Sequence, residues 1–352
     1  LYIEDCEIGF KGISVTGGGE LFVEDTTRHG NSFISFRPDY GSKWDGRIRL
    51  RGCTLKPTGG STVSVLSYRM RNFDYQYPIG FARSLVIDDM VVDYSAALDS
   101  GAPCWLMNVV PFSRTEAGTR LFFPTFVQFR DIRVKGRQQG VRLAHIPNPQ
   151  HYDLGSPGGY DGSRLEANCR IGVENVQLEK LTPERPGDRG SVHLLIGSDD
   201  EQDYTDGHAL YPEIRFSDCD GVGAYFGNSI ASAFFERCSI NTLTAPGLRG
   251  EFGFSHCRLQ PDLQELDGDI YALDSTLGTR FTNCTLHAPR VNGELRPDLV
   301  DRTGLLEING PVRHYHLNTA LGNHVLKYCQ DKDIALDPDF IERLKLHHPL
   351  EE

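Results

Sequence analysis

Two consecutive carboxylates, Asp199 and Asp200, are the residues of this sequence best placed for acid and base chemistry. They follow an apolar run at 192–196 through Gly197-Ser198, at the end of an expected strand. Glycoside hydrolysis needs two carboxyl groups, about 5 to 5.5 Å apart for retention of configuration and about 6.5 to 9.5 Å for inversion. Successive strand residues point to opposite sides, so a partner for Asp199 or Asp200 must come from elsewhere in the chain.

Asp39 and Asp74 are the candidate partners, and the residues around them suit a saccharide. Flat aromatic faces pack on sugar rings, and guanidinium and imidazole groups hydrogen-bond to hydroxyls. The alternative interpretation is a solvated acidic loop with aromatic side chains that anchor it to a scaffold. The candidate substrate-binding residues are Arg37, Tyr40, Trp44, Arg69, Tyr75 and His145.

A rival chemistry is β-elimination of a uronic acid polymer, in which a basic side chain abstracts a proton next to a neutralised carboxylate. The net charge of −12 disfavours polyanions unless the cleft is locally basic. The residues that could form such a site are Arg37, Lys43, Arg69, Arg71 and His145.

Metal and cofactor signatures are weak. No CxxC pair or zinc spacing occurs among the nine cysteines, and no Walker A or GxGxxG motif stands in a suitable context. The acidic run 199–203 could ligate Ca²⁺ through oxygen, but the twelve-residue EF-hand pattern is missing. We therefore expect no metal and no cofactor, with Ca²⁺ as the alternative.

The composition narrows the class of protein. The 352 residues include 36 Lys and Arg against 48 Asp and Glu, with no basic stripe, so nucleic acid is not an expected partner. No apolar stretch is long enough for a transmembrane helix, and no signal peptide pattern opens the chain. The 37 glycines and 19 prolines favour many short strands over a helical bundle.

A six-residue phrase organises these strands. Its six positions are, in order, apolar, polar, turn-prone, Cys or aliphatic, polar, and aliphatic. The shortest distance between the starts of two successive copies is 19 residues, which is enough for one coil of a parallel β-helix. A bend at the third residue would let the first, fourth and sixth side chains share one core. Stacked coils would then place Cys219, Cys238 and Cys257 in one buried file. The copies begin at Ile3, Leu50, Ile87, Phe129, Val173, Phe216, Phe235, Phe254 and Phe281.

On these phrases the sequence resembles the right-handed parallel β-helix proteins of the pectin lyase-like superfamily, over roughly residues 1–310. Residues 36–46 and 73–78 are similar to segments of uncharacterised Bacteroidetes β-helix proteins. The resemblance implies an all-β fold, a right-handed single-stranded parallel β-helix. It also favours a secreted or periplasmic location, whereas nine cysteines without obvious pairing suit a reducing compartment.

Two segments follow from this pattern. Residues 1–312 are expected to form the β-helix, and residues 313–352 a short helical C-terminal cap, with helices at 318–330 and 337–346. Because the chain opens inside a repeat, we expect a preceding segment or a partner to cover the first coil. A homo-oligomer that buries one flank is an alternative.

Function should lie in the insertions between phrases. If the strands stack, the insertions leave one edge of neighbouring coils and wall a groove for a polysaccharide or oligosaccharide. The favoured function is a glycoside hydrolase. The alternatives are a polysaccharide lyase and a non-catalytic glycan-binding or structural β-helix. The insertions span 37–46, 67–78, 108–124, 145–167 and 197–212.

Overall fold

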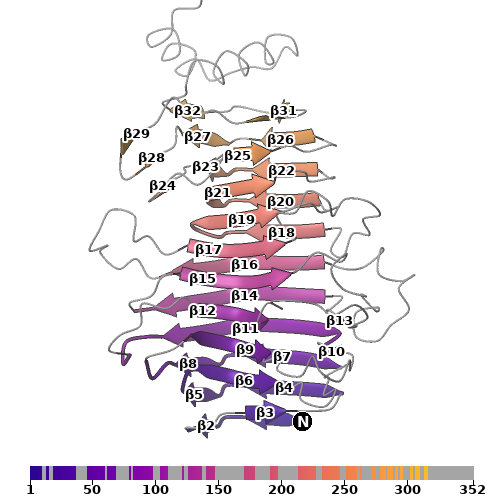
Figure 1. Ribbon diagram of the computed structural model, residues 1–352, viewed down its shortest axis with the longest axis vertical. Coiled ribbons are helices and arrows are strands. Elements are labelled where there is room, and N and C mark those ends of the chain that lie inside the picture. The colour runs from indigo at the N-terminus through magenta and orange to yellow at the C-terminus, as the bar shows by residue number, and fades with distance from the viewer. Residues whose placement is uncertain are drawn as a thin grey trace, which may run out of the picture.

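Every regular element in the described part of the chain is a β-strand, in a computed structural model of the protein (Figure 1). The described residues are 1–9, 13–15, 19–36, 46–59, 62–68, 79–80, 82–97, 104–109, 121–122, 126–136, 140–146, 170–178, 191–196, 213–226, 232–245, 251–259, 262–263, 271–273, 278–282, 284–287, 290–291, 294–295, 302–303, 306–309 and 313–315. No helix long and apolar enough to cross a membrane occurs among them.

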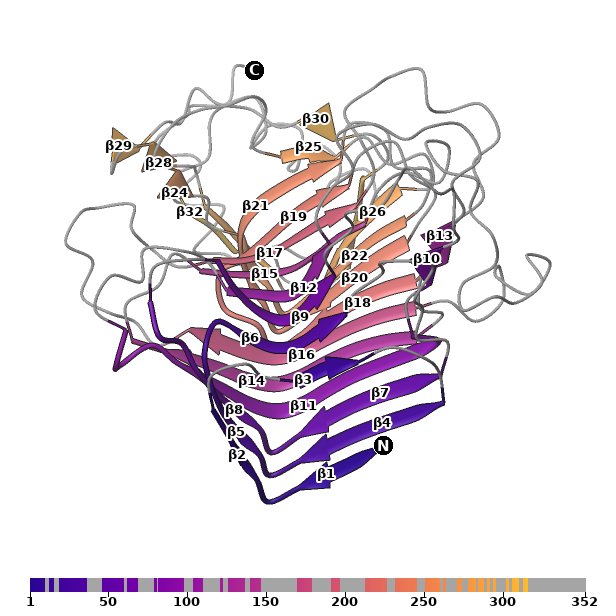
Figure 2. The same cartoon turned by 60° about the horizontal axis from the view of Figure 1, so that its bottom comes forward.

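The first sheet contains one strand from each repeat of the phrase. Its strands pair in parallel in chain order, so segments far apart in sequence lie side by side (Figure 2). Its main strands are β1 (Tyr2–Glu4), β4 (Glu20–Glu24), β7 (Arg47–Arg51), β11 (Ser84–Asp93), β14 (Phe126–Lys135), β16 (Arg170–Leu178), β18 (Glu213–Ser217), β20 (Ser232–Glu236), β22 (Glu251–Ser255), β26 (Gly278–Thr282) and β31 (Leu306–Asn309).

A second sheet runs beside the first, and the chain alternates between the two. Its main strands are β3 (Ile13–Val15), β6 (Ser32–Phe36), β9 (Val63–Tyr68), β12 (Cys104–Val109), β15 (Gly140–Ile146), β17 (Ser191–Ile196), β19 (Val222–Phe226), β21 (Ser239–Ala245), β23 (Arg258–Leu259), β27 (Thr285–His287) and β32 (Arg313–Tyr315). We call one passage through both sheets a coil. Parallel strands stacked in this way are compatible with a parallel β-helix.

The remaining strands are short. After the bend, β2 (Glu7–Ile8), β5 (Thr27–His29) and β8 (Thr54–Lys56) continue the first sheet. β25 (Tyr271–Leu273) and β30 (Arg302–Thr303) join the second sheet. β10 (Ile79–Gly80) pairs with β13 (Leu121–Phe122), and β24 (Asp262–Leu263), β28 (Arg290–Val291) and β29 (Glu294–Leu295) form a separate sheet.

The bend at the third phrase residue is confirmed. The left-handed region is accessible to Gly and enriched in Asp, Asn and His, which explains most of the residues found at this position. Beyond the bend, the fourth side chain is buried in the core in every described coil except the first, where Cys6 is exposed. The residues with positive φ at the bend are Asp5, Asp25, Gly52, Asp89, Asp131, Asn175, Asp218, Arg237 and His256.

The cysteine file is also confirmed. The Ser239 amide donates to the Cys219 carbonyl at 3.0 Å, and the Arg258 amide donates to the Cys238 carbonyl at 2.9 Å, so successive fourth residues are superimposed. The Cys219, Cys238 and Cys257 thiols are buried and free. Beside them Phe216, Phe235 and Phe254 stack, with 5.1 Å between successive ring centroids.

The long gaps between phrases have two origins. The interval from Ile3 to Leu50 holds an additional coil at β4, which the search missed because Thr26 takes the place of cysteine at the fourth position. The intervals from Leu50 to Phe216 are single coils with insertions, because β7, β11, β14, β16 and β18 pair directly. The predicted cap helices at 318–330 and 337–346 lie outside the described residues.

Candidate functional site

The five insertions begin next to one another along a single edge. The strands that precede them, β6, β9, β12, β15 and β17, are consecutive parallel neighbours in the second sheet. Phe36 pairs with Tyr68, Tyr68 with Val109, and Ile146 with Ile196, so their carboxyl ends are aligned. We call this the insertion edge. The expectation that the insertions leave the same side of neighbouring coils is therefore correct at the strand ends.

The second sheet presents a polar row with one large aromatic residue, Trp105, near the amino-terminal ends of its strands. Trp105 is half-buried, and the Arg142 guanidinium lies over its ring, 5.2 Å from the centroid. On the same strand as Trp105, the Asn108 amide donates at 3.0 Å to the hydroxyl of the buried Ser64 on β9. Trp105 was not among the site residues that the sequence predicted. Trp105, Asn108 and Arg142 become a common surface only when β12 and β15 are placed side by side.

Most of the predicted site residues lie outside the described residues. His145 belongs to β15, where its backbone is aligned with Leu195 near the insertion edge. Its side chain is not described. The predicted residues outside the described part are Asp39, Asp74, Asp199, Asp200, Arg37, Tyr40, Trp44, Arg69 and Tyr75.

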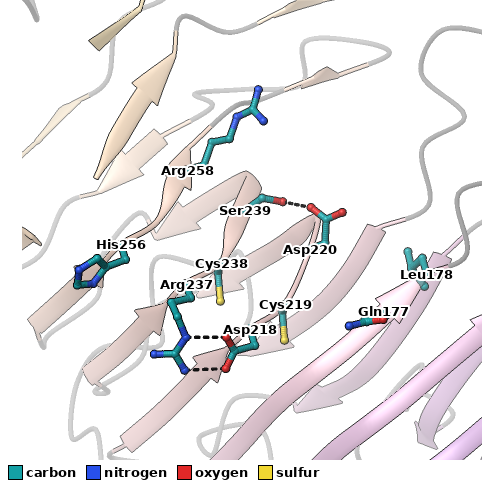
Figure 3. Close-up of a pocket in the computed structure, with 10 residues that line it drawn as sticks. All are labelled: Gln177, Leu178, Asp218, Cys219, Asp220, Arg237, Cys238, Ser239, His256 and Arg258. Atoms are coloured by element: carbon teal, nitrogen blue, oxygen red, sulfur yellow. Dashed lines mark hydrogen bonds and ion pairs between the residues drawn. The ribbon is translucent and has the colours of Figure 1, made fainter. Parts of the chain in front are cut away.

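A second feature lies at the bends, between the first and second sheets. Here a hollow of about 560 Å³ opens beside β16 and the next three coils (Figure 3). We call it the bend bay. β16 continues beyond its bend to Leu178, whereas β18, β20 and β22 end at theirs, and this step in the coil creates the space. The lining residues are Gln177, Leu178, Asp218, Cys219, Asp220, Arg237, Cys238, Ser239, His256 and Arg258.

Acidic and basic side chains alternate around the bend bay. The Arg237 guanidinium donates two hydrogen bonds to the Asp218 carboxylate, at 2.6 and 2.7 Å, and a further one to Glu236. This bidentate hydrogen bonding lowers the pKa of Asp218, so the carboxylate stays ionised at neutral pH. The Ser239 hydroxyl donates to Asp220 and accepts from the Gly221 amide at 2.8 Å.

The thiols at the floor of the bend bay are poor nucleophiles. A hydrogen bond with Cys238, together with burial, raises the pKa of the Cys219 thiol. For Cys238 the hydrogen bond with Cys219 acts in the opposite direction, but the bond with Cys257 and burial outweigh it, and the pKa rises to about 12. Reactivity requires the thiolate. These cysteines are therefore structural at neutral pH.

No cluster of three or more metal-ligating side chains occurs among the described residues. The bend bay was not predicted, although Arg237 and His256 depart visibly from the Asp, Asn and Gly of the other bends. No protein-family model matches this chain, and no solved structure matches it significantly. The candidate surfaces therefore rest on geometry and residue chemistry alone.

Proposed function

We propose that this protein is a carbohydrate-active, right-handed, single-stranded parallel β-helix that hydrolyses a polysaccharide along the insertion edge. The observation that supports the proposal is the side-by-side origin of five insertions at the ends of β6, β9, β12, β15 and β17. Insertions that start on adjacent coils can contact successive units of one polymer. Functional residues are concentrated on loops held by a rigid scaffold.

The polar row on the second sheet supports a carbohydrate as the substrate. Trp105 offers an aromatic face, and Arg142 and Asn108 offer hydrogen-bonding groups on the same sheet. Sugars are bound by this combination of ring stacking and hydrogen bonding to hydroxyls. In the proposal Asp199 or Asp200 works with Asp39 or Asp74 as the acid and base pair. Arg37, Tyr40, Trp44, Arg69, Tyr75 and His145 hold the substrate.

The decisive test is release of reducing ends from a panel of neutral and acidic polysaccharides. Replacing the catalytic acid or base should lower the rate at least hundredfold, because general acid or base catalysis contributes about 10² to 10⁴-fold. We therefore expect Asp199→Asn or Asp200→Asn to remove activity from the substrate that the unmodified chain cleaves. Asp89→Asn is the matched control, since Asp89 is exposed at a bend where Asn is also tolerated.

Three results would contradict the hydrolase assignment. Full activity in both variants would show that neither aspartate takes part. Products with a new ultraviolet absorbance, together with loss of activity in Arg69→Ala, would identify β-elimination instead. If the unmodified chain bound a polysaccharide but did not cleave it, the protein would be a glycan-binding module and not an enzyme.

A further inference from the structure

The bend bay contains the residue at these bends that fits its backbone conformation least well. Nine described bend residues have positive φ, and eight are Asp, Asn, Gly or His, the types that tolerate this region. Arg237, with φ of 51°, is the exception. Strained residues of this kind are concentrated at functional sites.

Stability does not account for Arg237. Its partners Asp218 and Glu236 are exposed, with 41% and 54% of their side-chain surfaces accessible. Exposed ion pairs contribute little to folding. The guanidinium nevertheless holds one fixed orientation at the wall of the bay, because it forms hydrogen bonds to both carboxylates. Such a fixed donor is useful for recognition.

The charges of the bend bay favour an uncharged ligand. Asp218 and Asp220 supply two negative charges, and Arg237 and Arg258 supply two positive charges. Within the described residues, no hydrogen bond or ion pair engages the Arg258 guanidinium. In the bend bay the arginines therefore supply hydrogen-bond donors, and the aspartates and Gln177 supply hydrogen-bond acceptors. A polyhydroxylated molecule uses both kinds of group, and the hollow of about 560 Å³ is within the usual size range of small-molecule sites.

The bend bay lies on a different edge of the coils from the insertions. It is formed where the chain passes from the first sheet to the second, whereas the insertions begin where the chain leaves the second sheet (Figures 2 and 3). A ligand in the bay would not occupy the proposed cleft. Binding there could anchor a polymer without taking part in its cleavage.

We propose that the bend bay is a second carbohydrate site, which binds one neutral sugar unit of the polysaccharide acted on at the insertion edge. In this assignment Arg258 and Arg237 donate hydrogen bonds to ring hydroxyls, and Asp220 accepts them. The identity of the polysaccharide rests on the proposed function. The binding of a neutral sugar in the bay does not.

The test measures binding of glucose, galactose, mannose, xylose and arabinose to the full chain by saturation-transfer NMR and calorimetry. We expect at least one of them to bind, and Arg258→Ala to weaken its affinity about tenfold, the effect of losing one charge-assisted hydrogen bond. Arg133→Ala is the control, because Arg133 is an exposed arginine on β14, outside the bay. Urea unfolding midpoints should be equal for both variants.

The outcomes separate this proposal from the proposed function. Hydrolysis without sugar binding in the bay would overturn the second site and leave the hydrolase intact. Sugar binding that Arg258→Ala weakens, without any hydrolysis, would overturn the hydrolase and leave the second site. Binding of sulfate or acetate but of none of the five sugars would also overturn the second site, as would equal affinities for Arg258→Ala and Arg133→Ala.

Discussion

Three central coils and the coils on either side of them form the same bend in different ways. In the central coils the strands β11, β14 and β16 run continuously through the bend, and the fourth residue is Met90, Ile132 or Val176. In the flanking coils β1, β4, β7, β18, β20, β22 and β26 end there, and the fourth residue is Cys or Thr.

The difference shows what the cysteines contribute. Where a strand ends, the fourth side chain donates to the carbonyl two residues earlier, as Cys219 does to Ser217 at 3.2 Å and Cys238 does to Glu236 at 3.3 Å. Thr26 makes the same bond to Glu24 at 2.7 Å with its hydroxyl. A small side chain with one donor is therefore required at an interrupted bend, and an aliphatic one suffices where the strand continues.

The largest effect should come from the aromatic stack of the flanking coils. Phe235→Ala removes a buried ring that is stacked on both Phe216 and Phe254. We expect a loss of about 3–5 kcal/mol in the free energy of unfolding. Phe129→Ala, at the same phrase position of a central coil, should cost about 0.5–1.5 kcal/mol less, because its neighbours in register, Ile87 and Val173, are aliphatic. Urea unfolding measures both, and an equal loss would contradict the contribution of the stack.

The second effect concerns an ion pair of the central coils in which the carboxylate is buried and the guanidinium is half-exposed. Asp88 is 6% exposed, and the Arg130 guanidinium donates to both of its oxygens, at 2.9 and 2.6 Å. Asp88→Ala should destabilise the protein by about 1–3 kcal/mol, because the two charge-assisted hydrogen bonds from Arg130 are lost. Asp218→Ala, which breaks an exposed pair in a flanking coil, should cost less than about 1 kcal/mol. If Asp218→Ala lowered the free energy of unfolding more than Asp88→Ala does, the comparison would be contradicted.

The Asp88 carboxylate also makes the stability of the protein depend on pH. Hydrogen bonding from Arg130 lowers the pKa of Asp88 below the unfolded value of about 3.9. A folded pKa below the unfolded one means that the contribution to stability is complete well above pH 4 and is lost as the pH falls through the folded pKa. Asp88→Asn should therefore lose less stability below about pH 4 than the unmodified chain does. Parallel curves from acid unfolding would show that Asp88 does not titrate in this way.

A smaller effect should follow from changing the cysteine file. Cys238→Ala leaves the Glu236 carbonyl without its thiol donor, and we expect a loss of about 1–2 kcal/mol. Cys238→Ser keeps a donor, as Thr26 does, and should lose less. Thermal unfolding under reducing conditions compares the two. If serine were the worse substitution, packing and not hydrogen bonding would explain the cysteines.

The smallest effect should come from Arg237→Asn. Asparagine fits the left-handed bend, so relief of strain offsets the loss of exposed ion pairs. The free energy of unfolding should change by less than about 1 kcal/mol. A large destabilisation, measured by urea unfolding, would mean that Arg237 is retained for stability and not for the bend bay.

The sequence was most informative where one coil repeats the chemistry of the next. The bend at Asp218 and the file of Cys219, Cys238 and Cys257 could be predicted, because the same residue types recur at one phrase position. The coil at β4 was missed because Thr26 performs the role of cysteine without resembling it. The bend bay arises from a change in strand length between β16 and β18, which no single phrase encodes.

The site was harder to predict than the scaffold. The row at Trp105 and Arg142 joins residues from separate coils, and only their strand register brings them together. Asp199, Asp200, Asp39 and Asp74 stay predictions, since their side chains lie outside the described residues. Insertions carry no repeating pattern, so their contents do not reveal which of them act together.

The most direct test of the account is hydrogen exchange with and without a saturating polysaccharide. We predict protection in the peptides that cover 37–46, 67–78, 108–124, 145–167 and 197–212 together, because the strands before these insertions end side by side at the insertion edge. The first-sheet strands β18, β20 and β22 should change little. Protection confined to one insertion, or distributed evenly over the coils, would contradict a shared cleft at this edge.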